Sequence, residues 1–284
     1  MKTFKYILSI LMLFAAVAVV AQDVISAKDA AELLKNDDVI FVSARTPADY
    51  AKVHVPGAVN IDHKALYAEK SMLDDPSKIA AIFGKNGISN SSTILIYDDG
   101  SMKYSGRLYW IMKYMGASDV QVIDGGMKAW RMARNPVTKN PSSIEATTFN
   151  PKPDASLLAS MSQVKKAVNS SSAVILDVRS ADEYNGVAST SLRPGHIPSA
   201  INMEFINVLN ADGTLKDNAE LKTLFTKAGI TPDKEVILYC ESSVRAGIVF
   251  LALKSGLKYP KVRVYDGAYI EWQSENANAV KDTE

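Results

Sequence analysis

The stretch VILYCESSVRAG, residues 236–247, contains the only cysteine of the 284-residue chain. Its first half is an apolar, partly β-branched run, which predicts a buried strand. Cys240 follows that run directly, and Arg245 closes the short polar segment before a helical pattern begins. A strand that delivers a loop to a helix is typical of α/β sheets, where sites form beyond the carboxyl ends of the strands. We therefore take Cys240 as the centre of a candidate site.

The pattern around Cys240 occurs twice in the chain. Residues 94–100 (ILIYDDG) correspond to residues 236–242 (VILYCES), and four other segments pair in the same way: 41–50 with 176–185, 54–61 with 196–203, 82–89 with 224–231, and 120–130 with 262–272. His54 and His196 are 142 positions apart, as are Trp130 and Trp272, whereas Arg45 and Arg179 are 134 apart. The constant spacing indicates a duplicated domain, with eight extra residues before the histidine of the second copy.

We predict two homologous α/β domains, residues 22–135 and 156–284, each a mainly parallel sheet flanked by helices. Residues 136–155, within a proline-rich stretch, are predicted to be an extended linker. The expected strands are 40–43, 94–97, 120–123, 174–177, 236–239 and 263–265. The expected helices are 27–34, 105–115 and 244–253.

The first 21 residues predict a secretory signal peptide. Lys2 and Lys5 precede a short apolar run that ends in small residues, with a cut expected after Ala21. The alternative is a membrane anchor, but the run is short for a spanning helix. We expect a periplasmic or secreted protein that is free of the membrane after cleavage. Without Lys2 and Lys5 the chain has 30 basic and 31 acidic residues, so it offers no basic surface for nucleic acid.

The loop after Cys240 suits a stabilised thiolate. A tight loop turns its backbone N–H groups inward, the helix expected near Val244 adds partial positive charge, and Arg245 adds a full charge. Ser242 and Ser243 offer hydroxyl donors. The alternative is that Cys240 is a small buried apolar residue, which is common for a free cysteine. The three histidines and one cysteine favour neither a cysteine–histidine protease pair nor a metal site.

Several motifs together give the chain a marked resemblance. They are DVRSADEY (177–184), RPGHIPSAIN (193–202), the Cys240 loop and YDGAYIEW (265–272), and the first copy repeats three of them as TPADY, HVPGAVNID and VIDGGMKAW. The sequence resembles tandem-domain rhodanese-type sulfurtransferases, the family of thiosulfate and 3-mercaptopyruvate sulfurtransferases. The match covers essentially the whole chain after residue 21.

The resemblance implies a ping-pong reaction through a persulfide on Cys240, with no metal or organic cofactor. The partners implied are a small sulfur donor and a cyanide or thiol acceptor, with a thioredoxin-like protein as a further candidate. The resemblance also places Glu241, Ser242, Ser243, Val244 and Arg245 around the persulfide.

The first copy is expected to be inactive, because Asp98 stands at the position of Cys240 and Ser43 at that of Asp177. The resemblance places Arg107 toward the site as an anion clamp from the opposite domain. The alternative is an ordinary arginine on a surface helix.

Other motif residues are expected to be structural. Asp177 and Arg179 are predicted to pair near the site, and His196 to stabilise its H-I-P turn, as His54 does in the first copy. Arg193, in the insertion of the second copy, is a weaker candidate for the cleft.

The donor is harder to predict, since CESSVRA matches neither the CGSGVTA loop of the mercaptopyruvate branch nor the CRKGVTA loop of animal thiosulfate enzymes. Arg245 favours thiosulfate, whereas Glu241 opposes a dianion if it faces the pocket. A phosphatase or arsenate reductase loop has five residues between cysteine and arginine, and this chain has four. A sulfur carrier or binding module that docks a protein partner is the other alternative.

Overall fold

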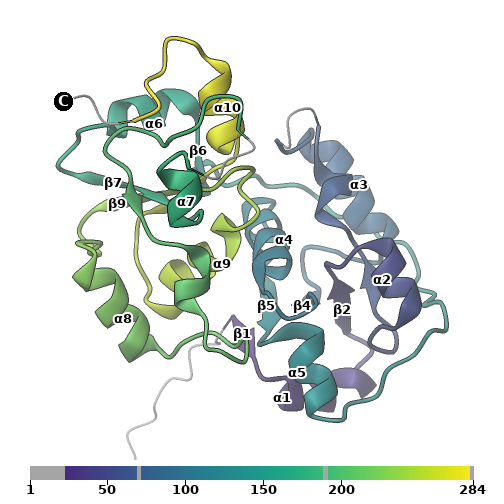
Figure 1. Ribbon diagram of the computed structural model, residues 1–284. Helices are drawn as coiled ribbons and strands as arrows, with labels where there is room; N and C mark the ends of the chain where they lie inside the picture. Colours follow the sequence, from purple (N-terminus) through teal and green to yellow (C-terminus); the bar gives the residue numbers. More distant parts are fainter. Residues whose placement is uncertain (1–22, 69–71, 188–190, 282–284) are drawn as a thin grey trace, which may run out of the picture.

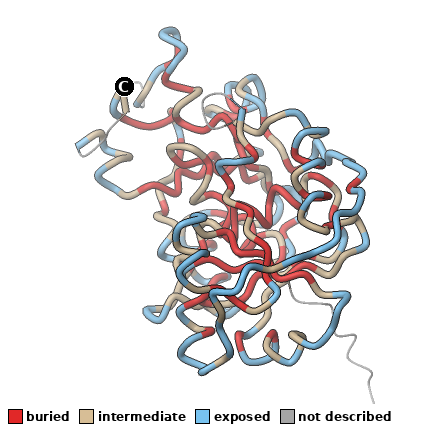
Figure 2. The backbone as a smooth tube through the Cα atoms, turned by 90° about the vertical axis from the view of Figure 1, so that its right-hand side faces the viewer, coloured by how far each residue is buried: buried red, intermediate tan, exposed pale blue. Residues whose placement is uncertain are grey.

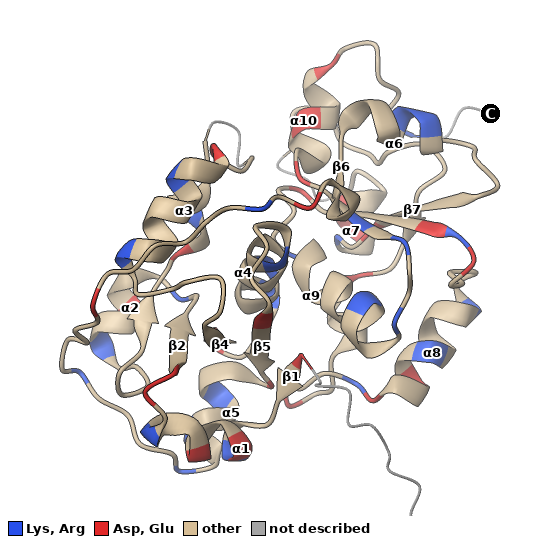
Figure 3. Ribbon diagram, turned by 180° about the vertical axis from the view of Figure 1, so that it is seen from behind, with Lys and Arg blue, Asp and Glu red and all other residues tan. Residues whose placement is uncertain are grey.

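The computed structural model describes residues 23–68, 72–187 and 191–281, which form two α/β domains side by side (Figure 1). The predicted signal peptide, residues 1–21, lies outside the described residues. Within the described residues, no helix combines the length and the apolar character needed to cross a bilayer. Figure 3 shows the positions of basic and acidic residues interspersed along the ribbon of both domains.

Each domain contains one five-stranded parallel sheet, which confirms the predicted α/β class. The first sheet has the order β1-β5-β4-β2-β3 and the second β6-β10-β9-β7-β8. The strands are β1 (Val24–Ile25), β2 (Val39–Ser43), β3 (Val59–Asn60), β4 (Thr93–Tyr97), β5 (Asp119–Ile123), β6 (Leu158–Ala159), β7 (Ala173–Asp177), β8 (Ile201–Asn202), β9 (Glu235–Tyr239) and β10 (Val262–Tyr265). The central strands are buried after their first residue, as apolar strands covered on both faces should be.

Helices cover both faces of each sheet. The α-helices are α1 (Ala27–Glu32), α2 (Pro47–Lys52), α3 (Pro76–Lys85), α4 (Lys103–Tyr114), α5 (Gly126–Met132), α6 (Met161–Ala167), α7 (Ala181–Tyr184), α8 (Asn218–Lys227), α9 (Ala246–Leu251) and α10 (Ala268–Ser274). Short 3-10 turns lie at Leu33–Lys35, His63–Leu66, Ala155–Leu157 and Phe205–Val208, and a π-helical turn lies at Ala252–Gly256.

The expected helices differ from the structure at their ends: the helix predicted at 27–34 is α-helical over Ala27–Glu32, and the helix predicted at 105–115 spans Lys103–Tyr114. The helix predicted at 244–253 begins two residues later, at Ala246, and becomes a π-helical turn from Ala252. Arg245 is the residue before the helix, and Ser243 in the loop takes a left-handed conformation, with φ 56°. The additional loop residues surround the cysteine.

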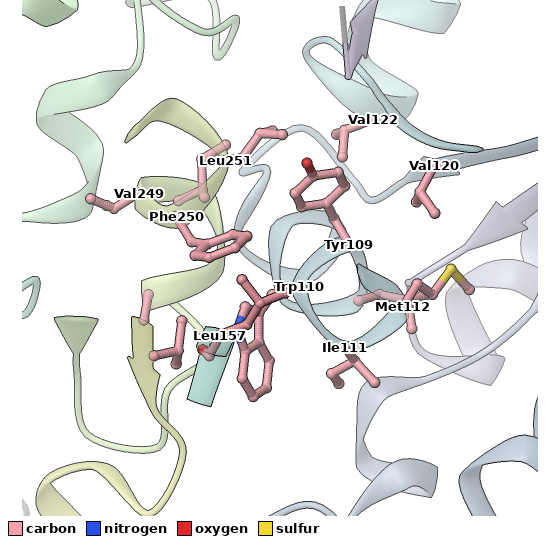
Figure 4. Packing of buried hydrophobic residues seen from close by; sticks show 14 of the residues in the cluster. Tyr109, Trp110, Ile111, Met112, Val120, Val122, Leu157, Val249, Phe250 and Leu251 are labelled. Atoms are coloured by element: carbon pink, nitrogen blue, oxygen red, sulfur yellow. The ribbon is translucent and has the colours of Figure 1, made fainter. Parts of the chain in front are cut away.

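The two domains share one hydrophobic core. Each domain has a hydrophobic cluster of its own, and a third, continuous cluster contains residues of both domains. Figure 2 shows the buried residues gathered in the middle of the molecule. Figure 4 shows the centre of this shared core, where Tyr109 of α4 faces Phe250 of α9, with ring centroids 6.3 Å apart. A Cβ added to Gly106 would lie 2.5 Å from the backbone nitrogen of Ile248, so glycine permits this close helix crossing.

Two reciprocal hydrogen bonds also join the domains. The backbone N–H of Leu73 donates to Asp266, and that of Leu215 donates to Asp124, both at 2.8 Å. Each residue is 142 positions from its counterpart, so the contacts follow the sequence repeat. The duplicated domains therefore pack with approximate two-fold symmetry, which brings α4 of the first domain close to the Cys240 loop of the second.

Candidate active site

Cys240 lies immediately after β9, the central strand of the second sheet, and only 1% of its surface is exposed. The loop that follows is fixed from the adjacent strand and helix. The carbonyl groups of Cys240 and Glu241 accept hydrogen bonds from the backbone of α10, at Tyr269 (3.0 Å) and Ile270 (3.1 Å). The hydroxyl of Ser243 donates to the carbonyl of Tyr265 at the end of β10. Ser243 therefore anchors the loop, and its hydroxyl is not directed to a ligand.

Arg245 lies beside the sulfur and is held by Glu183. Its two terminal nitrogens donate to the two carboxylate oxygens of Glu183, at 2.6 and 2.8 Å. Burial lowers the pKa of Arg245, but its hydrogen bonds with Glu183 and with Cys240 outweigh burial and raise it. Burial also raises the pKa of Glu183, and Arg245 more than offsets this, lowering the pKa to about 2. A cation is thus fixed next to the sulfur.

Glu241 is engaged inside the second domain. One of its oxygens accepts from Arg179 at 3.2 Å, and the other accepts from Ser191 at 2.8 Å and from Gln273 at 3.2 Å. Its carboxylate therefore connects the Cys240 loop to α10 and to the insertion of the second copy. If this partly buried carboxylate turned toward an incoming anion, it would lose its three hydrogen-bond donors. We therefore expect it to keep its present orientation.

Asp177 and Arg179 form a buried ion pair beneath the loop. Neither residue is exposed, and Arg179 donates to Asp177 through its Nε and one terminal nitrogen, the shortest distance being 2.7 Å. Arg179 also donates to the carbonyl of Gly195 at 2.7 Å and lies over the ring of Tyr269. The pair connects β7 to the turn that contains His196.

His196 is part of a turn and packs against Tyr184. Its ring stacks on Tyr184 with centroids 3.8 Å apart, and Nδ1 lies 3.0 Å from the carbonyl oxygen of the same residue. His54 makes the same contacts with Tyr50 in the first domain. Arg193 does not reach the cleft, because its guanidinium donates to two carbonyl groups after α10, those of Glu275 and Asn278.

Arg107 lies fully buried at the domain interface, so the alternative of a surface helix arginine is wrong. Its Nε donates to the hydroxyl of Tyr67 at 3.1 Å, one terminal nitrogen donates to Asp266 at 2.5 Å, and the guanidinium lies 4.7 Å from the ring centroid of Trp110. The other terminal nitrogen is buried and has no hydrogen-bond partner among the described residues. A buried, unpaired N–H is costly, so this nitrogen is suited to receive a ligand.

Sequence reasoning missed the residues that surround Arg107. His63 packs against Tyr67 and Tyr104, with centroid distances of 5.4 and 5.0 Å. Burial raises the pKa of Tyr67, Arg107 opposes this, and the charges of Asp266 and Cys240 add to the increase. Burial lowers the pKa of His63 to about 4. Their position just beyond β3, at the carboxyl edge of the sheet, was the signal that could have identified them.

The charges of the site are balanced by pairs. Three arginines of the candidate site are each bound to a carboxylate: Arg107 to Asp266, Arg179 to Asp177 and Glu241, and Arg245 to Glu183. The site therefore has directed N–H donors without an excess of positive charge. Across residues 23–68, 72–187 and 191–281, no cluster of histidine, cysteine and acidic side chains is suited to hold a metal ion.

These features define a tandem α/β protein with one buried cysteine in a strand–loop–helix cradle. The profile of the rhodanese-like domain matches residues 26–133 and residues 160–275. A protein of Synechococcus elongatus named "Putative thiosulfate sulfurtransferase" is 36% identical over 262 residues, 87% of this chain and 81% of the relative. "Sulfur carrier protein TtuD" of Thermus thermophilus is 32% identical over 237 residues, 78% of this chain and 83% of the relative.

Among solved structures, SseA from Escherichia coli, described as a 3-mercaptopyruvate sulfotransferase, superposes with a TM-score of 0.80 at 28% identity. The similarity covers 87% of this chain and 99% of SseA. The chain belongs to the rhodanese-like family, with two copies of the domain. The prediction of a sulfurtransferase is confirmed at the level of enzyme class.

Proposed function

We propose that the second domain moves a sulfane sulfur through a persulfide on Cys240. The Cys240 thiolate attacks the outer sulfur of thiosulfate, a sulfur–sulfur bond forms to Cys240, and the bond within the donor breaks to release sulfite. An acceptor such as cyanide then attacks the outer sulfur of the persulfide and leaves as thiocyanate, which regenerates the thiolate. The observation that supports this most directly is Arg245, fixed by Glu183 against the cysteine sulfur.

A small donor suits the depth of the site. With 1% of its surface exposed, Cys240 is reached by a narrow group that presents one sulfur atom. Thiosulfate is the donor we favour, because the relative from Synechococcus elongatus carries that name and because Glu241 is bound to Arg179 and so does not oppose a dianion. We place the chemistry in the second domain alone, since Asp98 replaces the cysteine in the first.

3-Mercaptopyruvate is a second candidate donor, supported by the similarity to SseA. Its single carboxylate suits the open N–H of Arg107. A sulfur carrier that passes its persulfide to a protein thiol, such as that of a thioredoxin-like protein, is the alternative that the similarity to TtuD supports. The sequence of residues 1–21 supports a periplasmic or secreted location for any of these reactions.

The test compares initial rates of the protein without residues 1–21, with thiosulfate and cyanide in one assay and 3-mercaptopyruvate and a small thiol in the other. We expect turnover with thiosulfate, and mass spectrometry should find one added sulfur atom on Cys240 after donor alone. Cys240→Ser should remove both signals. Transfer retained by Cys240→Ser would refute the nucleophile, and a persulfide that forms without release to either small acceptor would favour the carrier.

A further inference from the structure

Asp98 occupies the loop of the first domain that corresponds to the Cys240 loop. It follows β4 as Cys240 follows β9, and its carboxylate is completely buried. Four backbone N–H groups donate to this carboxylate: Gly100 at 2.8 Å, Met102 at 3.1 Å, Tyr104 at 3.1 Å and Ser105 at 3.3 Å. The first domain thus retains a cradle of N–H groups, and its own side chain supplies the anion that fills it.

The carboxylate of Asp98 performs the task of a helix cap for α4. Met102, the residue before the helix, has φ 55° and provides no side-chain acceptor. The N–H groups at the start of a helix need an acceptor from outside the helix. Asp98 accepts from the second and third residues of α4, Tyr104 and Ser105, and its negative charge also interacts favourably with the helix dipole. The beginning of α4 is therefore held by a side chain that lies several residues before the helix in the sequence.

Helix α4 connects this cap to the active site. Arg107 lies on the turn that follows Ser105, and its guanidinium crosses the interface to Asp266. One residue earlier, Gly106 touches the backbone of α9 at Gly247, close to Arg245. A change in the position of the first turn of α4 must therefore displace Arg107 or the α4–α9 contact, because the tight crossing leaves no free space.

We propose that Asp98 is a positioning residue: an internal anion in the inactive domain that holds α4 so that Arg107 faces the Cys240 site. The inference rests on the proposed function for its consequence, since Arg107 matters there as a donor of N–H groups to the incoming anion. Asp98 itself touches neither the substrate nor the sulfur. Its loss should weaken recognition of anions at Cys240 while the sulfur chemistry of the second domain persists.

The experiment measures alkylation of Cys240 by iodoacetate, an anion, and by neutral iodoacetamide. The ratio of the two rates reports anion recognition without requiring turnover. We expect Asp98→Ala to lower this ratio by about fivefold, the effect of losing one well-aligned hydrogen bond from Arg107 to the anion. Added formate should restore the ratio, because it can accept from the N–H groups that the Asp98 carboxylate has left. Thr46→Ala is the matched control, because Thr46 caps a different helix of the same domain, α2, by accepting from the backbone N–H of Asp49.

Asp98→Asn is a second variant, which keeps the side-chain volume and one acceptor oxygen. It serves as the test if Asp98→Ala does not fold, and its ratio of alkylation rates should be lower than that of the unaltered protein. In Arg107→Lys protein, removing the Asp98 carboxylate should have no further effect on the ratio, since coupled residues are not additive. An unchanged ratio in a folded Asp98 variant, or additive effects with Arg107→Lys, would overturn the proposal. Failure of the proposed function is seen separately, as lack of persulfide formation in the unaltered protein.

Discussion

The carboxylate of Glu241 lies 3.2 Å from the guanidinium of Arg179, although Glu241 directly follows the nucleophile in sequence. Arg179 is fully buried and also holds Asp177. An acidic residue beside Cys240 therefore belongs to the framework of the second domain. Arg179 thereby connects Glu241 to Asp177 at the end of β7. The negative charge of Glu241, next to the cysteine, is thus neutralised within the protein before any donor binds.

Glu241→Gln should lower stability more than it changes donor recognition. The amide keeps an acceptor for Ser191 but loses the ion pair with Arg179, and we expect a loss of about 1–3 kcal/mol in the free energy of unfolding. Urea denaturation measures this loss, and the KM for thiosulfate should change little. A large decrease of that KM would mean that the carboxylate faces the donor in the working enzyme.

Arg107→Lys should weaken donor binding. Lysine keeps the charge but lacks the planar set of donors that reaches Tyr67, Asp266 and the open position at once. We expect the KM for the donor to rise by about tenfold, the effect of losing one hydrogen bond to a charged group, with a smaller change in kcat.

Arg263→Lys is the matched control for Arg107→Lys. Arg263 forms a partly exposed ion pair with Glu235 at 3.0 Å, away from the Cys240 loop at the other end of β9. Steady-state kinetics on both variants separates a role at the site from a general effect of changing a paired arginine. Equal KM values for the two variants would exclude Arg107 as a clamp.

His63 should make stability depend on pH in mildly acidic solution. Burial lowers its pKa from 6.5 to about 4, so the unfolded chain binds a proton in this interval and the folded protein does not. Stability should therefore rise with pH between about 4 and 6.5 and be lost as the pH falls through this window. In His63→Gln protein this part of the slope should disappear, as measured by urea midpoints across the interval. An identical slope in both proteins would assign it to other groups.

Gly247→Ala should separate the two domains at their helix crossing. An added Cβ would collide with the backbone of Gly106 and Arg107, and overpacking of this kind costs about 1–3 kcal/mol or more. Gly256→Ala is the control, since its Cβ would meet side chains alone, the oxygen of Asn218 at 3.2 Å and Leu221 at 3.6 Å. Thermal unfolding and donor KM should both be affected in the first variant and barely in the second. Tolerance of alanine at 247 would show that the crossing is loose.

The amino-acid sequence by itself determined the duplication, the α/β class and the position of the cysteine loop. These follow from local pattern, because apolar β-branched runs specify buried strands and a constant spacing of 142 residues specifies a repeat. The same local pattern placed the start of α9 within two residues of its position in the structure.

Only the tertiary structure decided which charges meet. Glu241 pairs with Arg179, and Arg245 pairs with Glu183. Arg107 pairs with Asp266 across the domain interface. His63 and Tyr67 joined the site although they lie more than 170 positions before Cys240. The physical reason is that a side chain's partner depends on which strand ends and helices pack together. Sequence spacing fixes the order of the strands along the chain, whereas burial of the shared core fixes how the two domains face each other.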